Sequence, residues 1–245
     1  MKLQGKIAVI TGGSRGLGKS IAKRFLQEGA TVIITATNES KLLQTADELG
    51  AFGEIEGVKM DVSLFDEVQE KMAKIIAKYG RVDILVNNAG IVMDAQLVKM
   101  TEDQFDSVLA VNLKGVFNCA KAVVNSMIQN NFGRIINISS VVAHNGNFGQ
   151  TNYAASKAGV IAMAQTWAKE LGKKGITANA IAPGYLSTEM IDTVPEQVIE
   201  MIKSKTPVKR LGSPEEIAAA CAYLASDDAA FINGATIKVD GGLAL

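Results

Sequence analysis

Short runs of apolar residues alternate with longer amphipathic stretches along all 245 residues of the chain. In most of these runs Val, Ile and Ala occupy consecutive positions, which is typical of parallel strands buried on both faces. The stretches between the runs have the spacing of amphipathic helices. The pattern therefore predicts an α/β fold, a doubly wound parallel sheet of about seven strands with helices on both faces. The expected strands are Ile7–Thr11, Thr31–Thr37, Gly57–Val62, Ile84–Asn88, Arg134–Ser139, Thr177–Ala182 and Thr236–Val239.

No internal repeat, low-complexity run or linker interrupts this alternation, so we expect one domain over residues 1–245. Lys and Arg balance Asp and Glu at 25 each, which argues against a nucleic-acid-binding protein. Cys119 and Cys221 stand singly in apolar contexts and indicate buried thiols in a reducing compartment. No uninterrupted apolar run reaches the length of a membrane span, and the first residues leave no room for a signal peptide. The expectation is a cytoplasmic protein that does not bind a membrane.

A glycine-rich turn follows the first expected strand and precedes a helix. Glycines at this place let the backbone approach a pyrophosphate, whose charge then lies at the helix N-terminus. The spacing is Gly-x-x-x-Gly-x-Gly, within a Rossmann-like series of strands and helices. The turn therefore predicts dinucleotide binding. The residues expected to contact the cofactor here are Gly12, Ser14, Arg15, Gly16, Leu17 and Gly18.

The end of the second strand indicates which dinucleotide binds. Enzymes that use NAD usually place an acid there for the ribose 2′-hydroxyl. This chain has Thr35-Ala36-Thr37-Asn38, with no acid before Glu39. Arg15 could pair bidentately with a 2′-phosphate, and the alternative is that it is a solvated loop residue. We therefore predict NADPH (NADP+) as the cofactor, with Thr37 beside it.

Two further strand ends carry polar groups toward the same edge of the sheet, where doubly wound folds bind ligands. Asp61 could accept a hydrogen bond from the adenine amino group, or it could cap the helix that starts near Ser63. Asn87-Asn88-Ala89-Gly90 supplies amides and a turn after the fourth strand. From these two segments the expected cofactor contacts are Asp61, Val62, Asn88, Ala89 and Gly90.

Tyr153 and Lys157 are four residues apart, so on a helix their side chains project from one face. A free tyrosine has a pKa near 10, and a lysine cation one turn away favours the phenolate and lowers that pKa. Ser140 could donate a hydrogen bond to a substrate oxygen where charge develops. These groups can move a proton on or off an oxygen while something else moves a hydride.

With these pieces in order, the chain resembles the short-chain dehydrogenase/reductase family over essentially its whole length. The resemblance implies that Tyr153 is the general acid, that Ser140 polarises the carbonyl, and that Lys157 lowers the tyrosine pKa while it holds the nicotinamide ribose. Asn112 would support a water that feeds protons to the lysine. The family is usually tetrameric and uses no metal, which implies a homotetramer with no metal site. The matching features also include Pro183 and Gly184, and they place Thr188 beside the cofactor.

Within the family, the 3-oxoacyl thioester reductases resemble this chain most. One branch acts on acyl carrier protein thioesters, and another reduces acetoacetyl-CoA. Carrier-protein reductases commonly have a basic residue just before the fifth strand, where this chain has Gln129-Asn130-Asn131-Phe132, although Lys173 and Lys174 lie on a nearby helix end. The acetoacetyl-CoA branch is similar at three positions. These are Phe148, Gln150 and Tyr185, of which Gln150 and Tyr185 join Ser140 and Tyr153 as expected substrate contacts.

The sequence therefore predicts an NADPH-dependent reductase of a 3-oxoacyl thioester, carried on acyl carrier protein or coenzyme A. The alternatives are an acetoacetyl-CoA-specific reductase, a dehydrogenase of a sugar, polyol or other small alcohol, and a non-catalytic dinucleotide sensor. His144, the only histidine, is expected to play no part. Apolar residues between about 185 and 210 predict a lid over the substrate, or else amphipathic surface helices.

Overall fold

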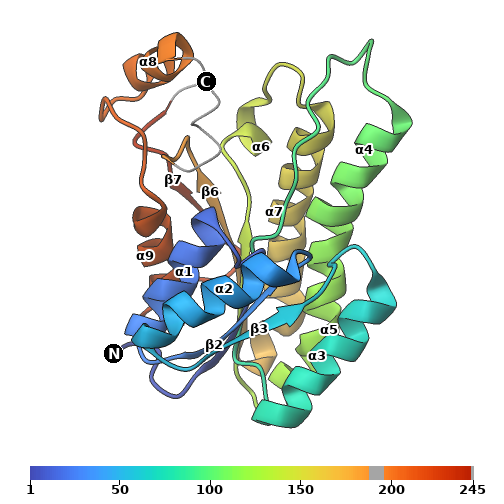
Figure 1. Ribbon diagram of the computed structural model, residues 1–245, viewed down its shortest axis with the longest axis vertical. Helices are drawn as coiled ribbons and strands as arrows, with labels where there is room; N and C mark the ends of the chain where they lie inside the picture. The colour runs from blue at the N-terminus through green and yellow to red at the C-terminus, as the bar shows by residue number, and fades with distance from the viewer. Residues whose placement is uncertain (188–195, 244–245) are drawn as a thin grey trace.

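A single seven-stranded parallel sheet forms the centre of the molecule, in the strand order β3-β2-β1-β4-β5-β6-β7 (Figure 1). The structure is a computed structural model and describes residues 1–187 and 196–243. The predicted doubly wound α/β fold is confirmed, because every neighbouring pair of strands is parallel. The strands are β1 (Ile7–Thr11), β2 (Thr31–Ala36), β3 (Ile55–Lys59), β4 (Ile84–Asn87), β5 (Gly133–Ile138), β6 (Ile176–Pro183) and β7 (Thr236–Val239).

Helices cover both faces of the sheet because consecutive strand residues point to opposite sides. Ile10 and Ile34 belong to a core with helices α1, α2 and α9, whereas Val9 and Ile33 pack on α3 and α5. Most strand residues between the two layers are therefore apolar, which explains the apolar runs in the sequence. The helices are α1 (Gly16–Gln27), α2 (Glu39–Leu49), α3 (Phe65–Tyr79), α4 (Glu102–Leu109), α5 (Gly115–Gln129), α6 (Val142–Asn145), α7 (Thr151–Leu171), α8 (Glu196–Lys205) and α9 (Pro214–Ala225).

The expected boundaries of the third strand were wrong. The prediction was Gly57–Val62, but β3 pairs with β2 from Ile55 to Lys59. The chain leaves the sheet after Lys59 because the side chain of Asp61 forms a turn, in which Oδ1 accepts from the Ser63 N–H at 2.9 Å. The last residues of the predicted strand, 60–62, therefore lie beyond β3, at the carboxyl end of the sheet.

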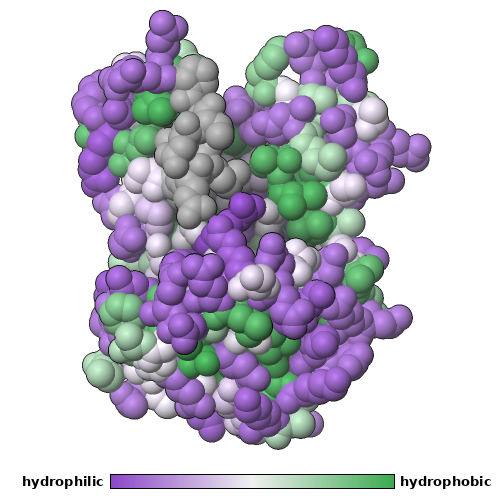
Figure 2. Space-filling model, in the orientation of Figure 1, coloured by the Kyte–Doolittle hydropathy of each residue, from purple (hydrophilic) through white to green (hydrophobic). Residues whose placement is uncertain are grey.

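The strand order reverses between β1 and β4, and this is the point at which such sheets bind ligands. The loops after β1 and β4 leave in opposite directions there, and the loops after β5 and β6 rise beside them. Figure 2 shows the upper part of the molecule split into two lobes. One lobe carries α8 and the other carries α4, with hydrophobic atoms gathered on the α4 side of the split (Figures 1 and 2).

Among the described residues, one helical stretch, Glu102–Gln129, has the length and composition to cross a membrane. It comprises α4, a π-helical turn η2 (Ala110–Lys114) and α5. Cys119 and Met127 on this stretch are fully enclosed, and its packed face lies against α3 and the sheet. The stretch is thus a core helix of the α/β body.

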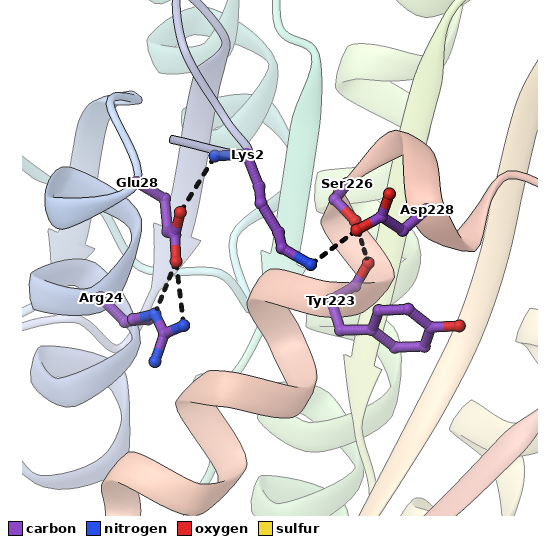
Figure 3. A network of polar contacts seen from close by, with 6 residues as sticks. All are labelled: Lys2, Arg24, Glu28, Tyr223, Ser226 and Asp228. Carbon is purple, nitrogen blue, oxygen red and sulfur yellow. Dashed lines mark hydrogen bonds and ion pairs between the residues drawn. The ribbon is translucent and has the colours of Figure 1, made fainter.

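A polar network joins the N-terminus to the C-terminal end of α1 and to the short helix η4 (Asp227–Ala229) (Figure 3). The Lys2 N–H donates to Glu28 at 3.0 Å, and the Lys2 ammonium pairs with Asp228 at 2.6 Å. Arg24 donates to the same Glu28 carboxylate, and the backbone bond from Lys2 is the main reason that the pKa of Glu28 is lowered. Exposed pairs of this kind add little stability, so the network orients the terminus rather than holding the fold.

Candidate active site

The glycine turn after β1 lies directly against the end of β4. Gly12 adopts φ +66°, and Asn88 Nδ2 donates to the carbonyl oxygens of Thr11 and Gly12 at 2.9 and 3.1 Å. At Gly18 an added Cβ would lie 2.2 Å from the Gly12 oxygen. Only glycine therefore lets α1 start this close to the turn, and the result is a backbone cradle at a helix N-terminus.

The N-terminus of α1 is open to an anion. Arg15 occupies the N-cap position in extended conformation, and no side chain caps the helix there. Its own side chain is exposed and has no hydrogen bond or ion pair among residues 1–187 and 196–243. Ser14 is buried and Leu17 is partly buried, so these two residues face the protein interior and support the turn. The free N–H groups and the Arg15 guanidinium suit a phosphate.

The end of β2 has no carboxylate free to face a ribose. Thr37 is exposed, and Asn38 Oδ1 accepts from the Lys41 N–H at 2.9 Å to cap α2. The first acid after the strand, Glu39, pairs with Lys59 at 3.6 Å. The charge of that carboxylate is therefore offset by a lysine on β3.

Beyond β3, Asp61 accepts from both the N–H and the hydroxyl of Ser63, at 2.9 and 2.7 Å. It does not cap α3, whose N-cap is Leu64, so the helix-capping alternative is wrong. The Val62 carbonyl oxygen accepts from the buried side chain of Asn118 at 2.8 Å. Both residues lie at the carboxyl end of the sheet, on the side of the glycine turn.

After β4, the backbone is held by the hydroxyl of Thr11, which accepts from the N–H groups of Asn88 and Ala89, both at 3.0 Å. Gly90 lies between the catalytic candidates: an added Cβ would be 3.3 Å from Asn112 Oδ1 and 3.6 Å from Lys157 Nζ. The segment predicted to contact the cofactor thus connects the glycine turn to the proton-moving groups.

Lys157 is buried on α7, and its ammonium donates to the Ile138 carbonyl oxygen at 2.8 Å. Burial lowers the pKa of Lys157 to about 8. The Lys157 nitrogen lies 5.6 Å from the centre of the Tyr153 ring, so the two side chains share one face of the helix as predicted.

The expected lowering of the tyrosine pKa is not what the structure shows. Partial burial raises the pKa of Tyr153, a hydrogen bond with Ser140 opposes this, and the carboxylate of Asp94 adds to the rise. Lys157 is not among the groups that shift the pKa of Tyr153, and its ammonium donates to the Ile138 carbonyl instead of the phenol. In this structure Tyr153 is therefore a protonated phenol, which is the form that a general acid requires.

Asn112 lies in the π-helical turn η2 and is fully buried. Its side chain accepts from the Ile91 N–H at 2.8 Å and donates to the Ile91 carbonyl at 2.9 Å. A longer bond of 3.4 Å reaches the hydroxyl of Ser156, one residue before Lys157. The wide turn places the Asn112 side chain beside Gly90, which Lys157 also borders, and such turns are frequent at functional sites.

Ser140 follows β5 and is half-buried beside Tyr153. Gln150 donates to Asp94 Oδ2 at 2.9 Å, and it accepts from Asn147 at 3.0 Å. Tyr185 follows β6, and its carbonyl accepts from the Gly212 N–H at 3.0 Å. Apart from Tyr153 on α7, the expected substrate residues therefore come from the segments after β5 and β6.

Pro183 ends β6, and its carbonyl oxygen accepts from the Val141 N–H at 3.0 Å. Gly184 lies against the backbone of Asp240, where a Cβ would be 2.9 Å away. Thr188 lies outside the described residues, as do Met190, Ile191 and Val194 of the predicted lid. Val198 and Met201 of α8 are partly exposed, and Ile202 is buried.

Sequence reasoning missed two side chains at this site. Asp94 is close enough to raise the pKa values of both Tyr153 and Tyr185. Asn152 is fully buried and bonds three backbone groups around Tyr153. A polar residue next to Tyr153 at the start of a helix was a signal for the second, whereas nothing in the sequence indicated the first.

A family model described as enoyl-(acyl carrier protein) reductase matches residues 12–244. Together with the glycine turn, the parallel sheet and the Tyr153–Lys157 pair, this match defines the class. The chain belongs to the short-chain dehydrogenase/reductase family, whose members use a nicotinamide cofactor.

Particular relatives are similar over full length. The 3-oxoacyl-(acyl-carrier-protein) reductase FabG of Thermotoga maritima is 48% identical, with 100% of both chains covered. The FabG protein of Escherichia coli K12 is 44% identical over 99% of both chains. A solved structure described as a candidate gluconate dehydrogenase from Agrobacterium tumefaciens is 33% identical, with a TM-score of 0.96, 99% of this chain and 97% of that chain covered.

Proposed function

We propose that the protein is an NADPH-dependent reductase of 3-oxoacyl thioesters. The observation that carries the proposal is the convergence of Ser140, Tyr153, Lys157 and Asn112 beside the backbone cradle of the glycine turn. Relatives named as 3-oxoacyl-(acyl-carrier-protein) reductases support the thioester as substrate. The fold by itself would not choose among ketones.

The chain's own residues provide the proton chemistry. A bound nicotinamide supplies the hydride to the keto carbon. Ser140 donates a hydrogen bond to the keto oxygen, and Tyr153 gives that oxygen its proton, which produces the 3-hydroxyl group. Lys157, with its pKa of about 8, can restore the proton to Tyr153, and Asn112 would support a water that resupplies the lysine.

The cofactor choice follows from two charges. Arg15 is exposed at the anion-binding end of α1, and Glu39 is paired with Lys59. Among residues 1–187 and 196–243, a 2′-phosphate at this place would therefore meet the unpaired guanidinium of Arg15, and the nearest acid along the chain is paired with a lysine. The test is the ratio of kcat/KM for NADPH and NADH. A higher value with NADH would contradict the proposal.

The acyl group of the substrate is carried on acyl carrier protein or on coenzyme A. The names of the relatives favour acyl carrier protein, which is acidic, and Lys173 and Lys174 offer positive charge in η3 (Gly172–Lys174). This short helix ends beside the turn before β5, since an added Cβ at Gly175 would lie 2.3 Å from the Asn131 oxygen. The experiment is NADPH oxidation with a carrier-protein-linked 3-oxoacyl chain and with acetoacetyl-CoA. Faster turnover on the carrier protein would support fatty-acid elongation, and faster turnover on coenzyme A would support the acetoacetyl-CoA reductase.

A small alcohol is the second candidate substrate. The likeness to a structure described as a candidate gluconate dehydrogenase supports it, because the two chains share one fold with a TM-score of 0.96. Oxidation of gluconate or other polyols with NADP+, without turnover of either thioester, would favour this candidate over the first.

We also propose a homotetramer. A groove of about 480 Å³ lies on the outer surface of α4, η2, α5 and α7, lined by Leu109, Leu113, Phe117 and Met163. Phe117 is 45% exposed there, and a second copy could cover this apolar face. A monomeric mass in solution at micromolar concentration would contradict the assembly.

A cytoplasmic location fits the two cysteines. Both Cys119 and Cys221 are free and buried, and burial raises the pKa of the Cys119 thiol to about 12. Such thiols are unreactive and persist in a reducing compartment. Fractionation of the native host's cells with an antibody would test this location.

A further inference from the structure

Asn152, the residue before Tyr153, makes three hydrogen bonds from a fully buried side chain. Its oxygen accepts from the Tyr153 N–H at 2.8 Å. Its amide nitrogen donates to the carbonyl oxygens of Met93 at 3.0 Å and Gln104 at 2.9 Å. Both N–H bonds of the amide group are thus used, and each partner belongs to a different segment of the chain.

The three hydrogen-bond partners of Asn152 lie in the segments that form the substrate side of the site. The Tyr153 N–H is one of the free donors in the first turn of α7. Met93 lies in the loop after β4, next to Asp94, and Gln104 lies in the first turn of α4. Asn152 therefore connects α7, which carries the proposed acid, to the loop after β4 and to α4.

Other bonds complete the attachment of the tyrosine. The Tyr153 carbonyl accepts from the Ser156 hydroxyl at 2.8 Å, so the backbone of Tyr153 is held at both its N–H and its C=O. The loop after β4 is joined a second time to the residues before α7, where the Ala95 N–H donates to the Gly149 oxygen at 2.9 Å. Among the described residues, Asn152 is the side chain that bonds both the backbone of Tyr153 and that loop.

We propose that Asn152 is a positioning residue for the reduction, which sets the place of the Tyr153 hydroxyl relative to the substrate loop. This inference rests on the proposed function. Small displacements of a proton donor cost large factors in rate, because proton transfer requires hydrogen-bond geometry. Cofactor binding should be independent of Asn152, since the glycine turn is built from β1, α1 and β4.

The chemistry of the side chain explains why an amide is needed. Alanine at this position would remove the donor to the carbonyls of Met93 and Gln104 and the acceptor of the Tyr153 N–H. Aspartate keeps the volume and the acceptor for the Tyr153 N–H, but it directs a carboxyl oxygen at two carbonyl oxygens. Both substitutions thus break the link from α7 to the carbonyls of Met93 and Gln104. Alanine removes the amide donor, and aspartate replaces it with an oxygen.

The test compares Asn152→Ala and Asn152→Asp with Asn179→Ala. Asn179 is a matched control, because it is 1% exposed and bonds the Ile232 oxygen at 2.8 Å and the Ala235 N–H at 2.9 Å, in β6 and away from the site. For each variant kcat and KM with acetoacetyl-CoA, the Kd of NADPH and the melting temperature are measured.

We expect both Asn152 variants to lose about tenfold or more in kcat, with a Kd for NADPH within about twofold of the wild type. Asn179→Ala should lower the melting temperature and keep kcat. Unchanged kcat in the Asn152 variants would overturn the inference, and so would equal losses of kcat in all three variants. If Asn152→Ala fails to fold, Asn152→Asp decides by the same readouts.

Tyr153→Phe, measured in parallel, separates this inference from the proposed function. Full turnover in that variant would contradict the general-acid role itself. Loss of turnover in Tyr153→Phe together with normal kcat in both Asn152 variants would overturn only the positioning role.

Discussion

The two halves of the site are built by different means. On the cofactor side the backbone itself forms the surface: at Gly18 a Cβ would lie 2.2 Å from the Gly12 oxygen, and at Gly13 it would lie 2.5 Å from Ile34. On the substrate side the loops are held by side chains such as Asn152 and Gln150. Large apolar side chains remain exposed there, with Val98 at 87% and Phe148 at 81%.

The difference has a physical consequence. The pyrophosphate of the cofactor is the same whatever the second substrate is, so a rigid backbone cradle suits it. An acyl group varies, and side chains can change without altering the sheet. Substitutions on the cofactor side should therefore act through backbone geometry, whereas those on the substrate side should act through rate or affinity with the fold intact.

Apart from the loss of the proposed acid itself, the largest effect should come from Gly18→Ala. The new methyl group would overlap the Gly12 oxygen and lie 2.6 Å from Asn88 Nδ2, so the turn must open. We expect about a hundredfold weaker NADPH binding, measured by fluorescence titration, and a lower melting temperature. Gly50→Ala is the control, because nothing lies within 4 Å of its Cβ. Equal NADPH affinity in the two variants would contradict the cradle.

Lys157→Met should change how stability depends on pH. The folded pKa of Lys157 is about 8, below its ordinary value of 10.5. Between these values the unfolded chain binds more protons, so this group makes the free energy of unfolding rise with pH. The wild type should gain about 2 kcal/mol relative to the variant between pH 8 and pH 10.

Urea unfolding of wild type and Lys157→Met at the two pH values measures that difference. Lys169→Met, at an exposed position of the same helix, should behave as the wild type does. A constant difference between wild type and Lys157→Met across the range would show that the lysine is not held in an unfavourable buried setting.

Arg15→Ala should separate the two nicotinamide cofactors. Removing the guanidinium takes away the proposed partner of the 2′-phosphate, which NADH lacks. We expect kcat/KM with NADPH to fall about tenfold, with little change for NADH. The NADH assay is the internal control. Equal losses with both cofactors would assign Arg15 to the turn rather than to the phosphate.

The smallest effect should follow Phe148→Ala. The ring is 81% exposed, so the free energy of unfolding should change by less than about 0.5 kcal/mol. If the ring contacts the acyl group, the KM for a 3-oxoacyl thioester should rise about threefold. Phe231→Ala removes a fully exposed ring outside the site and should leave KM unchanged. Equal KM values in the two variants would remove Phe148 from the substrate surface.

The sequence was sufficient for the parts that depend on local backbone geometry. Consecutive apolar residues predicted the buried parallel sheet, and the glycine spacing predicted the turn after β1. Tyr153 and Lys157 were placed on one face because a helix fixes that relation. The third strand was displaced because its end depends on pairing with β2 and on the turn at Asp61, neither of which periodicity reveals.

The electrostatics of the site were less predictable. Proximity in sequence suggested that Lys157 lowers the pKa of Tyr153, yet the lysine is directed at the Ile138 carbonyl and burial prevails. Asp94 reaches the site from a loop 59 residues before Tyr153, and only the folded chain brings them together. The roles of the site residues stay predictions until they are measured.

The most direct test of the account is the turnover of Tyr153→Phe with NADPH and a 3-oxoacyl thioester, alongside the Kd of NADPH. The account predicts that kcat falls about a hundredfold or more while the Kd stays within about twofold of the wild type. Near-normal kcat in this variant would contradict Tyr153 as the acid. An inactive wild type that still binds NADPH would contradict the thioester reductase itself.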